Sequence, residues 1–172
     1  MSTLETPSSN LLTAPSSEMD SIQREAFKRR LMWHGIFNCT LGFIIGLFIP
    51  LYANPRAGLA AHLIGITQGA FLAVIGLAYP QLKLQFWLGR VTYWLLVIGA
   101  YIGLLGQFLG AVFRLARMFI ITGQGLPEGI PWMETSIEIA NKTISTTLLL
   151  CCFVILYGLR GTKTDASSLE NS

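Results

Sequence analysis

The sequence has 172 residues, of which 52% are hydrophobic and only 12% are charged, and its net charge at pH 7 is +3. The charged fraction is about half that of an average soluble domain, which argues against a soluble fold and favours a lipid bilayer. The positive charges lie beside apolar runs rather than in a patch interleaved with aromatic residues, so nucleic acid is not expected as a partner.

The chain begins with a polar segment, residues 1–30, which contains many Ser, Thr, Pro and acidic residues and ends in a basic flank. It has no long apolar core, so it does not resemble a secretory signal, and we predict a disordered tail. Residues 161–172 have the same character at the other end. Between the tails, residues 31–160 are predicted to form one membrane domain.

Four apolar segments approach the roughly 20 residues that a helix needs to cross a hydrocarbon core of about 30 Å. They cover about residues 33–53, 59–79, 86–113 and 143–159. Only helices can satisfy the backbone of such isolated segments in lipid, so the sequence predicts an all-α, four-helix transmembrane bundle. The two connections between the first three spans are short, which makes these spans antiparallel neighbours.

The third connection, residues 114–142, contains GQGLPEGIPW, which is too rich in Gly and Pro for a continuous helix. A loop of this length can cap a site or serve as a simple connector. Basic residues set the expected orientation, with eight on the side of the termini and four on the opposite side. The positive-inside rule therefore predicts a multi-pass protein with both termini in the cytoplasm.

Polar side chains inside the spans should face the bundle or a cavity rather than lipid. The first three spans share eight of them, which predicts a polar pocket between these helices: Asn38, Thr40, His62, Thr67, Gln68, Tyr93, Tyr101 and Gln107. Glycines at helical spacing in the same spans permit close packing of helices or of a flat ligand. The three cysteines lie inside apolar runs without zinc-type spacing and are interpreted as small hydrophobic residues.

His62 is the most informative of these polar residues. It can be an interfacial side chain, a neutral imidazole bonded to a neighbouring helix, or a functional group that moves protons or binds a metal. A zinc site needs three or four ligands, which the sequence does not supply, whereas haem needs a single axial ligand. The other histidine, His34, is interpreted as an interfacial side chain at the start of its span.

Two stretches, HGIFNCTLGFIIGLFIP and NPRAGLAAHLIGITQGAFLAVIGLAYP, resemble the hydroxylaminobenzene mutases and, more distantly, the styrene oxide isomerases. The resemblance covers roughly residues 33–80 and is most specific at residues 54–69. It implies a small four-helix membrane isomerase that forms a homotrimer. It also implies a small apolar substrate, either an epoxide that becomes a carbonyl compound or an aryl hydroxylamine that becomes an aminophenol.

The resemblance also implies roles for particular residues. The histidine on the second span of the epoxide isomerases binds haem b, whose ferric iron acts as a Lewis acid before a hydride shift, and His62 matches that position. Gln68 stands where those enzymes carry an asparagine beside the reacting oxygen. The family uses a tyrosine on the third span, near Tyr101, with a nearby glycine as the alternative match. Gln68 and Tyr101 are the expected catalytic pair, and Arg56 is expected beside a haem propionate.

Two other classes of function remain open at this point. A non-catalytic tetraspan scaffold, or an accessory subunit of a biosynthetic complex, would use the same glycines and amides only for helix packing. A small transporter or channel is the other alternative, but no charged relay crosses the spans and no inverted repeat is visible.

Overall fold

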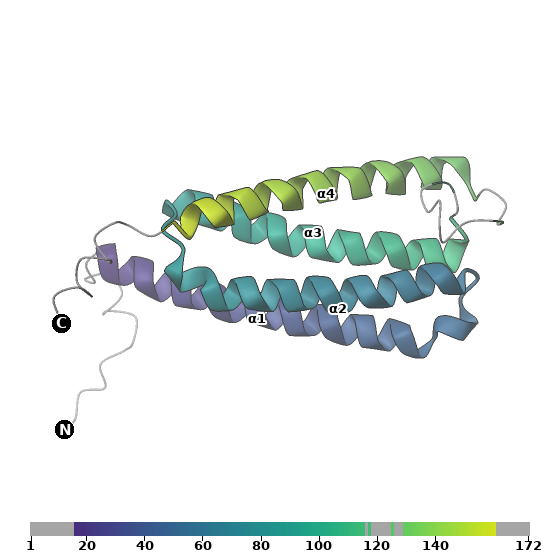
Figure 1. Cartoon of the computed structure of the whole chain (residues 1–172), viewed down its shortest axis with the longest axis horizontal. Helices are drawn as coiled ribbons and strands as arrows, with labels where there is room; N and C mark the ends of the chain where they lie inside the picture. The colour runs from purple at the N-terminus through teal and green to yellow at the C-terminus, as the bar shows by residue number, and fades with distance from the viewer. Residues whose placement is uncertain (1–15, 116, 118–124, 126–128, 161–172) are drawn as a thin grey trace, which may run out of the picture.

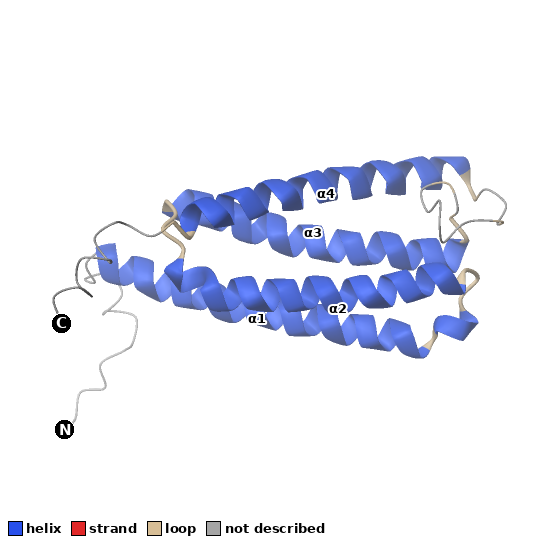
Figure 2. Cartoon of the chain, viewed as in Figure 1, coloured by secondary structure: helices blue, strands red, loops and turns tan. Residues whose placement is uncertain are grey.

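The computed structural model describes residues 16–115, 117, 125 and 129–160, and these residues form helices and turns but no strand (Figure 1; Figure 2). Two short 3-10 helices, η2 (Ile49–Leu51) and η3 (Tyr79–Gln81), flank the second of four long helices. The long helices are α1 (Ser16–Leu47), α2 (Pro55–Ala78), α3 (Phe86–Phe113) and α4 (Pro131–Gly158). They lie side by side, and α1 begins at the end of the bundle where α4 finishes (Figure 1).

Helices α2, α3 and α4 are long and apolar enough to cross a bilayer. Large apolar side chains are exposed along all of them, such as Leu63 on α2, Leu105 on α3 and Phe153 on α4. In water such a surface would be costly, whereas lipid solvates it. The chain is therefore an integral membrane protein, as predicted. The predicted boundaries of the third span, residues 86–113, coincide with α3.

The prediction of a disordered tail up to residue 30 is wrong for residues 16–30, because α1 begins at Ser16. Good helix formers such as Gln23, Glu25 and Lys28 fill this stretch. Its helix is also held by tertiary contacts. The Phe27 ring packs on the Tyr79 and Tyr93 rings, with centroids 5.6 and 4.8 Å away. Residues 1–15 and 161–172 lie outside the described part of the chain.

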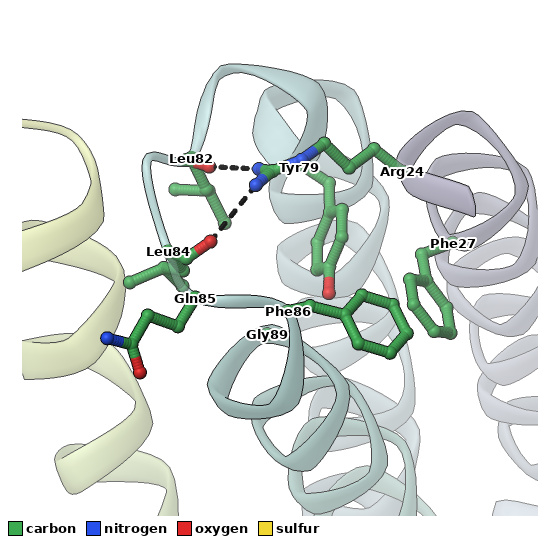
Figure 3. A pocket seen from close by; sticks show the side chains of 8 residues that line it. All are labelled: Arg24, Phe27, Tyr79, Leu82, Leu84, Gln85, Phe86 and Gly89. Atoms are coloured by element: carbon green, nitrogen blue, oxygen red, sulfur yellow. Dashed lines mark hydrogen bonds between the residues drawn. The ribbon is translucent and has the colours of Figure 1, made fainter. Parts of the chain in front are cut away.

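An arginine from the same stretch ties α1 to the connection between α2 and α3. The Arg24 guanidinium donates hydrogen bonds to the carbonyl oxygens of Leu82 and Leu84, as Figure 3 shows. These carbonyls belong to a turn and have no partner within a helix, so the arginine satisfies polar groups that would otherwise be costly to bury. The polar flank of α1 is therefore an integral part of the bundle.

Helix α4 begins at Pro131, about twelve residues before the predicted fourth span. Proline at the first helical positions needs no N–H partner, so it starts this helix rather than breaking it. The buried carboxylate of Glu134 holds the start in place by accepting hydrogen bonds from the backbone N–H groups of Arg117 and Gly129, at 3.2 and 3.1 Å. The Gly- and Pro-rich connection is therefore shorter than predicted.

Glycines bring α1 and α2 into backbone contact. A Cβ atom added to Gly65 would lie 2.6 Å from the Cα atom of Gly42, and one added to Gly69 would lie 2.5 Å from the carbonyl oxygen of Gly35. This is the use of small residues that the glycine spacing predicts, since packing between close backbones replaces the hydrophobic effect inside a membrane. The packing of α1 on α2 is the most extensive, followed by that of α2 on α3 and of α3 on α4.

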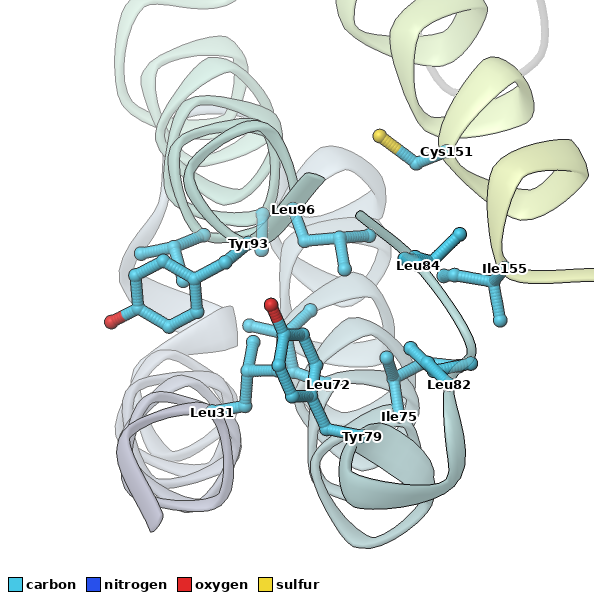
Figure 4. Packing of buried hydrophobic residues seen from close by; sticks show 12 residues of the cluster. Leu31, Leu72, Ile75, Tyr79, Leu82, Leu84, Tyr93, Leu96, Cys151 and Ile155 are labelled. Atoms are coloured by element: carbon cyan, nitrogen blue, oxygen red, sulfur yellow. The ribbon is translucent and has the colours of Figure 1, made fainter. Parts of the chain in front are cut away.

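The main apolar core lies among α1, α2 and α3 at the end of the bundle that holds the ends of the described chain (Figure 4). Leu31, Leu72 and Leu96 are its centre, with at most 1% of each side chain exposed. Cys151 and Ile155 attach α4 to the outside of this core. The cysteine is buried and unpaired, as predicted from its apolar surroundings.

At the opposite end of the bundle, Asn54 connects the start of α2 to the end of α3. Its side-chain oxygen accepts the N–H of Ala57 and so caps α2, while its own backbone N–H donates to the carbonyl oxygen of Ala111 at the end of α3, at 2.9 Å. Arg114, which ends α3 in a left-handed conformation, donates from Nε to the carbonyl oxygen of Ala53. The turn before α2 is thus fixed to the end of α3, which sets the position of His62 two turns further along.

Candidate functional site

His62 faces an open groove between α1 and α2. The Nδ1 atom of its imidazole lies 2.9 Å from the carbonyl oxygen of Gly42. A carbonyl only accepts hydrogen bonds, so Nδ1 must carry the ring proton, and Nε2 of the neutral ring keeps its lone pair. In many metal-binding histidines, a hydrogen bond of this kind from the nitrogen that does not bind the metal fixes the tautomer. His62 therefore presents a nitrogen that can bind a metal.

The place for this imidazole is made by Gly46, one turn after Gly42. A Cβ atom on Gly46 would collide with the imidazole Nδ1 atom. The groove outside the imidazole has a volume of about 340 Å³ and is lined by Thr40, Phe43, Ile44, Gly46, Leu47 and His62. Since the groove is open towards lipid and mostly apolar, a flat apolar ligand can lie in it without being enclosed by one chain.

Tyr101 lies in a different groove, between α1 and α3. This groove has a volume of about 490 Å³ and is almost wholly apolar, lined by Leu41, Ile44, Ile45, Phe48, Tyr52, Tyr101, Leu104, Leu105 and Phe108. The Tyr101 hydroxyl shares a 2.9 Å hydrogen bond with Nδ1 of His34. This pair could not be predicted from the sequence, because it depends on how α1 and α3 are rotated against each other.

Gln68 points to the inside of the bundle. Its Nε2 atom lies 2.9 Å from the place where a Cβ of Gly103 would be, so its amide fills the space beside that glycine of α3. Its Oε1 atom is buried and has no hydrogen-bond partner among the described residues. The two amide atoms of Asn38, which is fully buried, are in the same situation, as is Oε1 of Gln107. Such atoms are costly to bury unless water or a ligand bonds to them.

The prediction that all eight polar side chains face the bundle or a cavity is wrong for Thr67, whereas Thr40 lines the groove of His62. Both are exposed, and their hydroxyls donate to carbonyl oxygens one turn earlier in the same helix, those of Ile36 and Leu63. A threonine hydroxyl can satisfy itself on its own helix in this way, so it can face lipid at little cost. Asn38 and Tyr93, by contrast, are buried as predicted.

The three predicted site residues other than Arg56 do not meet within one chain. His62 borders the groove between α1 and α2, and Tyr101 borders the groove between α1 and α3; Ile44 lines both grooves. Gln68 lies between α2 and α3. Arg56 is exposed at the start of α2. Six helical residues separate it from His62, which corresponds to a rise of about 9 Å and a turn of about 240°, so the two side chains leave the helix on different faces.

The residues that the structure describes contain no cluster of three or more His, Cys, Asp or Glu side chains that could hold a metal ion. Zinc or another ion that needs several protein ligands therefore has no site in this part of the chain. Haem needs no such cluster, because its porphyrin supplies four ligands to the iron and His62 alone can supply an axial one.

Comparison with known proteins decides the family. Residues 27–160 match the family model of styrene oxide isomerase. The chain belongs to the styrene oxide isomerase family. It is 33% identical to hydroxylaminobenzene mutase HabB of Ectopseudomonas oleovorans, over 80% of this chain and 87% of that protein. It is 30% identical to hydroxylaminobenzene mutase HabA of the same organism, over 73% of this chain and 93% of that protein. No solved structure matches the chain.

Membership of this family shows that the chain is an isomerase, as its resemblance to the hydroxylaminobenzene mutases predicted. The scaffold and transporter alternatives receive no support, because the matched proteins are enzymes. The matched region begins at residue 27, within the part of α1 that precedes the predicted first span, and it includes all of α2, α3 and α4.

Proposed function

We propose that this isomerase rearranges a small apolar substrate with haem b bound to His62. The substrate is either an epoxide that becomes a carbonyl compound or an aryl hydroxylamine that becomes an aminophenol. The observation that carries the proposal is the hydrogen bond from His62 to the Gly42 carbonyl, which leaves Nε2 free at an open apolar groove. The bound haem would supply a Lewis acid to the substrate oxygen. Arg56 leaves α2 on a different face from His62, so it is proposed to pair with a propionate of the haem that a neighbouring chain holds.

The reaction of an epoxide needs no external oxidant or reductant. One carbon–oxygen bond breaks, a hydride moves with its electron pair from one ring carbon to the other, and the oxygen becomes a carbonyl. The protein must therefore bind the apolar part of the substrate, orient its oxygen and exclude water from the cationic carbon. The apolar walls of the Tyr101 groove and the Tyr101 hydroxyl are suited to these tasks, and the Gln68 amide is proposed as a second donor to the oxygen.

Because His62 and Tyr101 face different grooves of one chain, we propose that each active site is shared between two chains of a homotrimer. In a ring of three copies, one surface of each chain meets a different surface of the next. The groove of Tyr101 in one copy can then lie beside the groove of His62 in its neighbour. In this proposal α1 is the fourth membrane span, and both termini lie in the cytoplasm.

Mixed trimers test the shared site. His62→Ala and Tyr101→Phe chains should each be nearly inactive alone, and their co-expression should restore activity. Random assembly of equal amounts pairs an intact His62 with an intact neighbouring Tyr101 at about a quarter of the interfaces of such a ring. Activity near a quarter of the wild-type value in the co-purified protein is the expected result. No recovery in verified mixed trimers would place both residues in the same chain's site.

An isotopic label tests the reaction type. Purified protein is incubated with styrene oxide that carries deuterium on the ring carbon without the phenyl group. A phenyl group stabilises positive charge on its own carbon. With both hydrogens of the other ring carbon replaced by deuterium, we expect one deuterium to migrate to the phenyl-bearing carbon and the second to stay on the aldehyde carbon. Loss of the label to solvent during turnover would instead show acid–base enolisation. Hydroxylaminobenzene is assayed in parallel, and formation of an aminophenol in place of the aldehyde would assign the nitrogen–oxygen rearrangement.

A further inference from the structure

A third groove lies between α1 and α3 at the end of the bundle where α1 begins. It has a volume of about 270 Å³ and is lined by Gln23, Ala26, Phe27, Arg30, Phe86, Arg90 and Trp94. It shares no lining residue with the grooves of His62 and Tyr101. Cationic side chains from two helices and an aromatic wall therefore meet at a place that the isomerase reaction does not use.

The two arginines of this groove, Arg30 on α1 and Arg90 on α3, have exposed side chains. Among the side chains that the structure describes, no carboxylate pairs with either of them, and Glu25 is bonded to Lys28 instead, at 2.8 Å. Guanidinium groups bind phosphate oxygens in charge-assisted hydrogen bonds. The groove thus offers two unneutralised cations to an external anion.

The exposed aromatic side chains of this groove indicate that the anion belongs to a larger molecule with an apolar part. Trp94 and Phe86 are 48% and 42% exposed, and Phe86 lies next to Phe27 (Figure 3). Aromatic side chains of this kind are typical of the membrane interface, where one end of a lipid is polar and the other apolar. A soluble phosphate would leave this wall uncovered, whereas an acyl chain would cover it.

Beyond Arg30, one face of α1 continues towards the middle of the bundle with mostly apolar side chains. From Arg30, the positions of His34, Phe37 and Leu41 follow on the same face of α1 at spacings of three and four residues. One leaflet of a bilayer is about 15 Å of hydrocarbon, which corresponds to roughly ten helical residues. An acyl chain whose headgroup lies at Arg30 would therefore reach the beginning of the Tyr101 groove.

We propose that this groove binds an anionic phospholipid. The phosphate lies between Arg30 and Arg90, and one acyl chain lies on Phe86 and Trp94 and follows the α1 surface into the bilayer. The groove that holds the phosphate shares no lining residue with the grooves proposed for the substrate and the haem. Basic pockets between membrane helices are known to select anionic lipids by this combination of charge and apolar surface.

Native mass spectrometry in mild detergent tests the proposal with the full chain. Phosphatidylglycerol or phosphatidylcholine is added to the wild type and to an Arg30→Gln/Arg90→Gln variant. We expect the wild type to retain phosphatidylglycerol in preference to phosphatidylcholine. Each cation near an anionic lipid strengthens binding about fivefold, so the variant should bind phosphatidylglycerol on the order of 30-fold more weakly. Phosphatidylcholine carries the same phosphate, but its choline cation repels the arginines, so its affinity should fall by a smaller factor.

A matched control variant, Arg29→Gln/Arg160→Gln, removes the same charge from the same end of the bundle but outside the groove. It should keep the affinity for phosphatidylglycerol, and an equal loss would show a general charge effect and overturn the proposal. Glycerol phosphate forms the second arm, and binding as tight as that of the lipid would assign a soluble phosphate instead. If the double variant does not fold, the single Arg30→Gln and Arg90→Gln variants, each about fivefold weaker, serve the same purpose.

Discussion

Replacing His62 by alanine is expected to remove the haem absorption band of the purified protein and to abolish its isomerase activity. The substitution removes the imidazole whose Nδ1 atom is bonded to the Gly42 carbonyl and whose side chain lines the groove. A Lewis acid contributes several kcal/mol to the transition state, so activity should fall by on the order of a thousandfold. Absorption spectra in detergent and product formation from both substrate classes measure the two effects.

The second histidine provides the matched control for this experiment. The His34→Ala variant should keep the haem band, because the His34 ring is bonded to Tyr101 and does not border the groove of His62. Arg56→Ala should keep the band but lose haem faster on dilution if the propionate pairing is correct. A colourless, folded wild type, or a band that persists in His62→Ala, would contradict the assignment of His62 as the haem ligand.

The largest effect on stability is expected at Gly65. Alanine is a better helix former than glycine by about 1 kcal/mol, so helix propensity alone predicts that Gly65→Ala stabilises the protein. Its Cβ atom, however, would lie 2.6 Å from the Cα atom of Gly42, and a backbone atom can move only if α1 and α2 separate. Overpacking of this kind costs about 1–3 kcal/mol, so we expect a net loss and a melting temperature lower by several degrees.

Gly99→Ala is the matched control, since it makes the same chemical change in another buried helical position. There the added Cβ atom would lie 3.3 Å from the end of the flexible Leu148 side chain, and its next neighbours, Cγ of Leu148 and Cγ2 of Ile144, would lie at ordinary contact distances of 3.5 and 3.6 Å. The variant should be as stable as the wild type or slightly more stable. Thermal unfolding in detergent, followed by circular dichroism, compares the two. Equal melting temperatures for both variants would show that the contact between Gly42 and Gly65 does not limit the approach of α1 and α2.

The helices of this protein could be predicted largely from its sequence. In lipid every backbone group must be satisfied within its own helix, so a long apolar run such as residues 86–113 specifies an element without knowledge of its neighbours. The two largest errors in helix boundaries, at Ser16 and Pro131, lie where the chain is polar and where tertiary contacts hold the helix. Arg24 with the α2–α3 turn, and Glu134 with the α3–α4 connection, are such contacts, and composition gives no sign of them.

The sequence by itself determined that the protein lies in a membrane, which segments are helical and that His62 is the candidate metal-binding residue. Hydropathy and residue type are local properties, so they can be read without the fold. Only the tertiary structure decided where the other site residues point. A turn of 100° per residue places neighbours of one helix on different faces, and the rotation of one helix against another depends on contacts between residues far apart in the chain. For this reason Tyr101 meets His34 rather than Gln68, while His62 reaches Gly42 through the space that Gly46 leaves free.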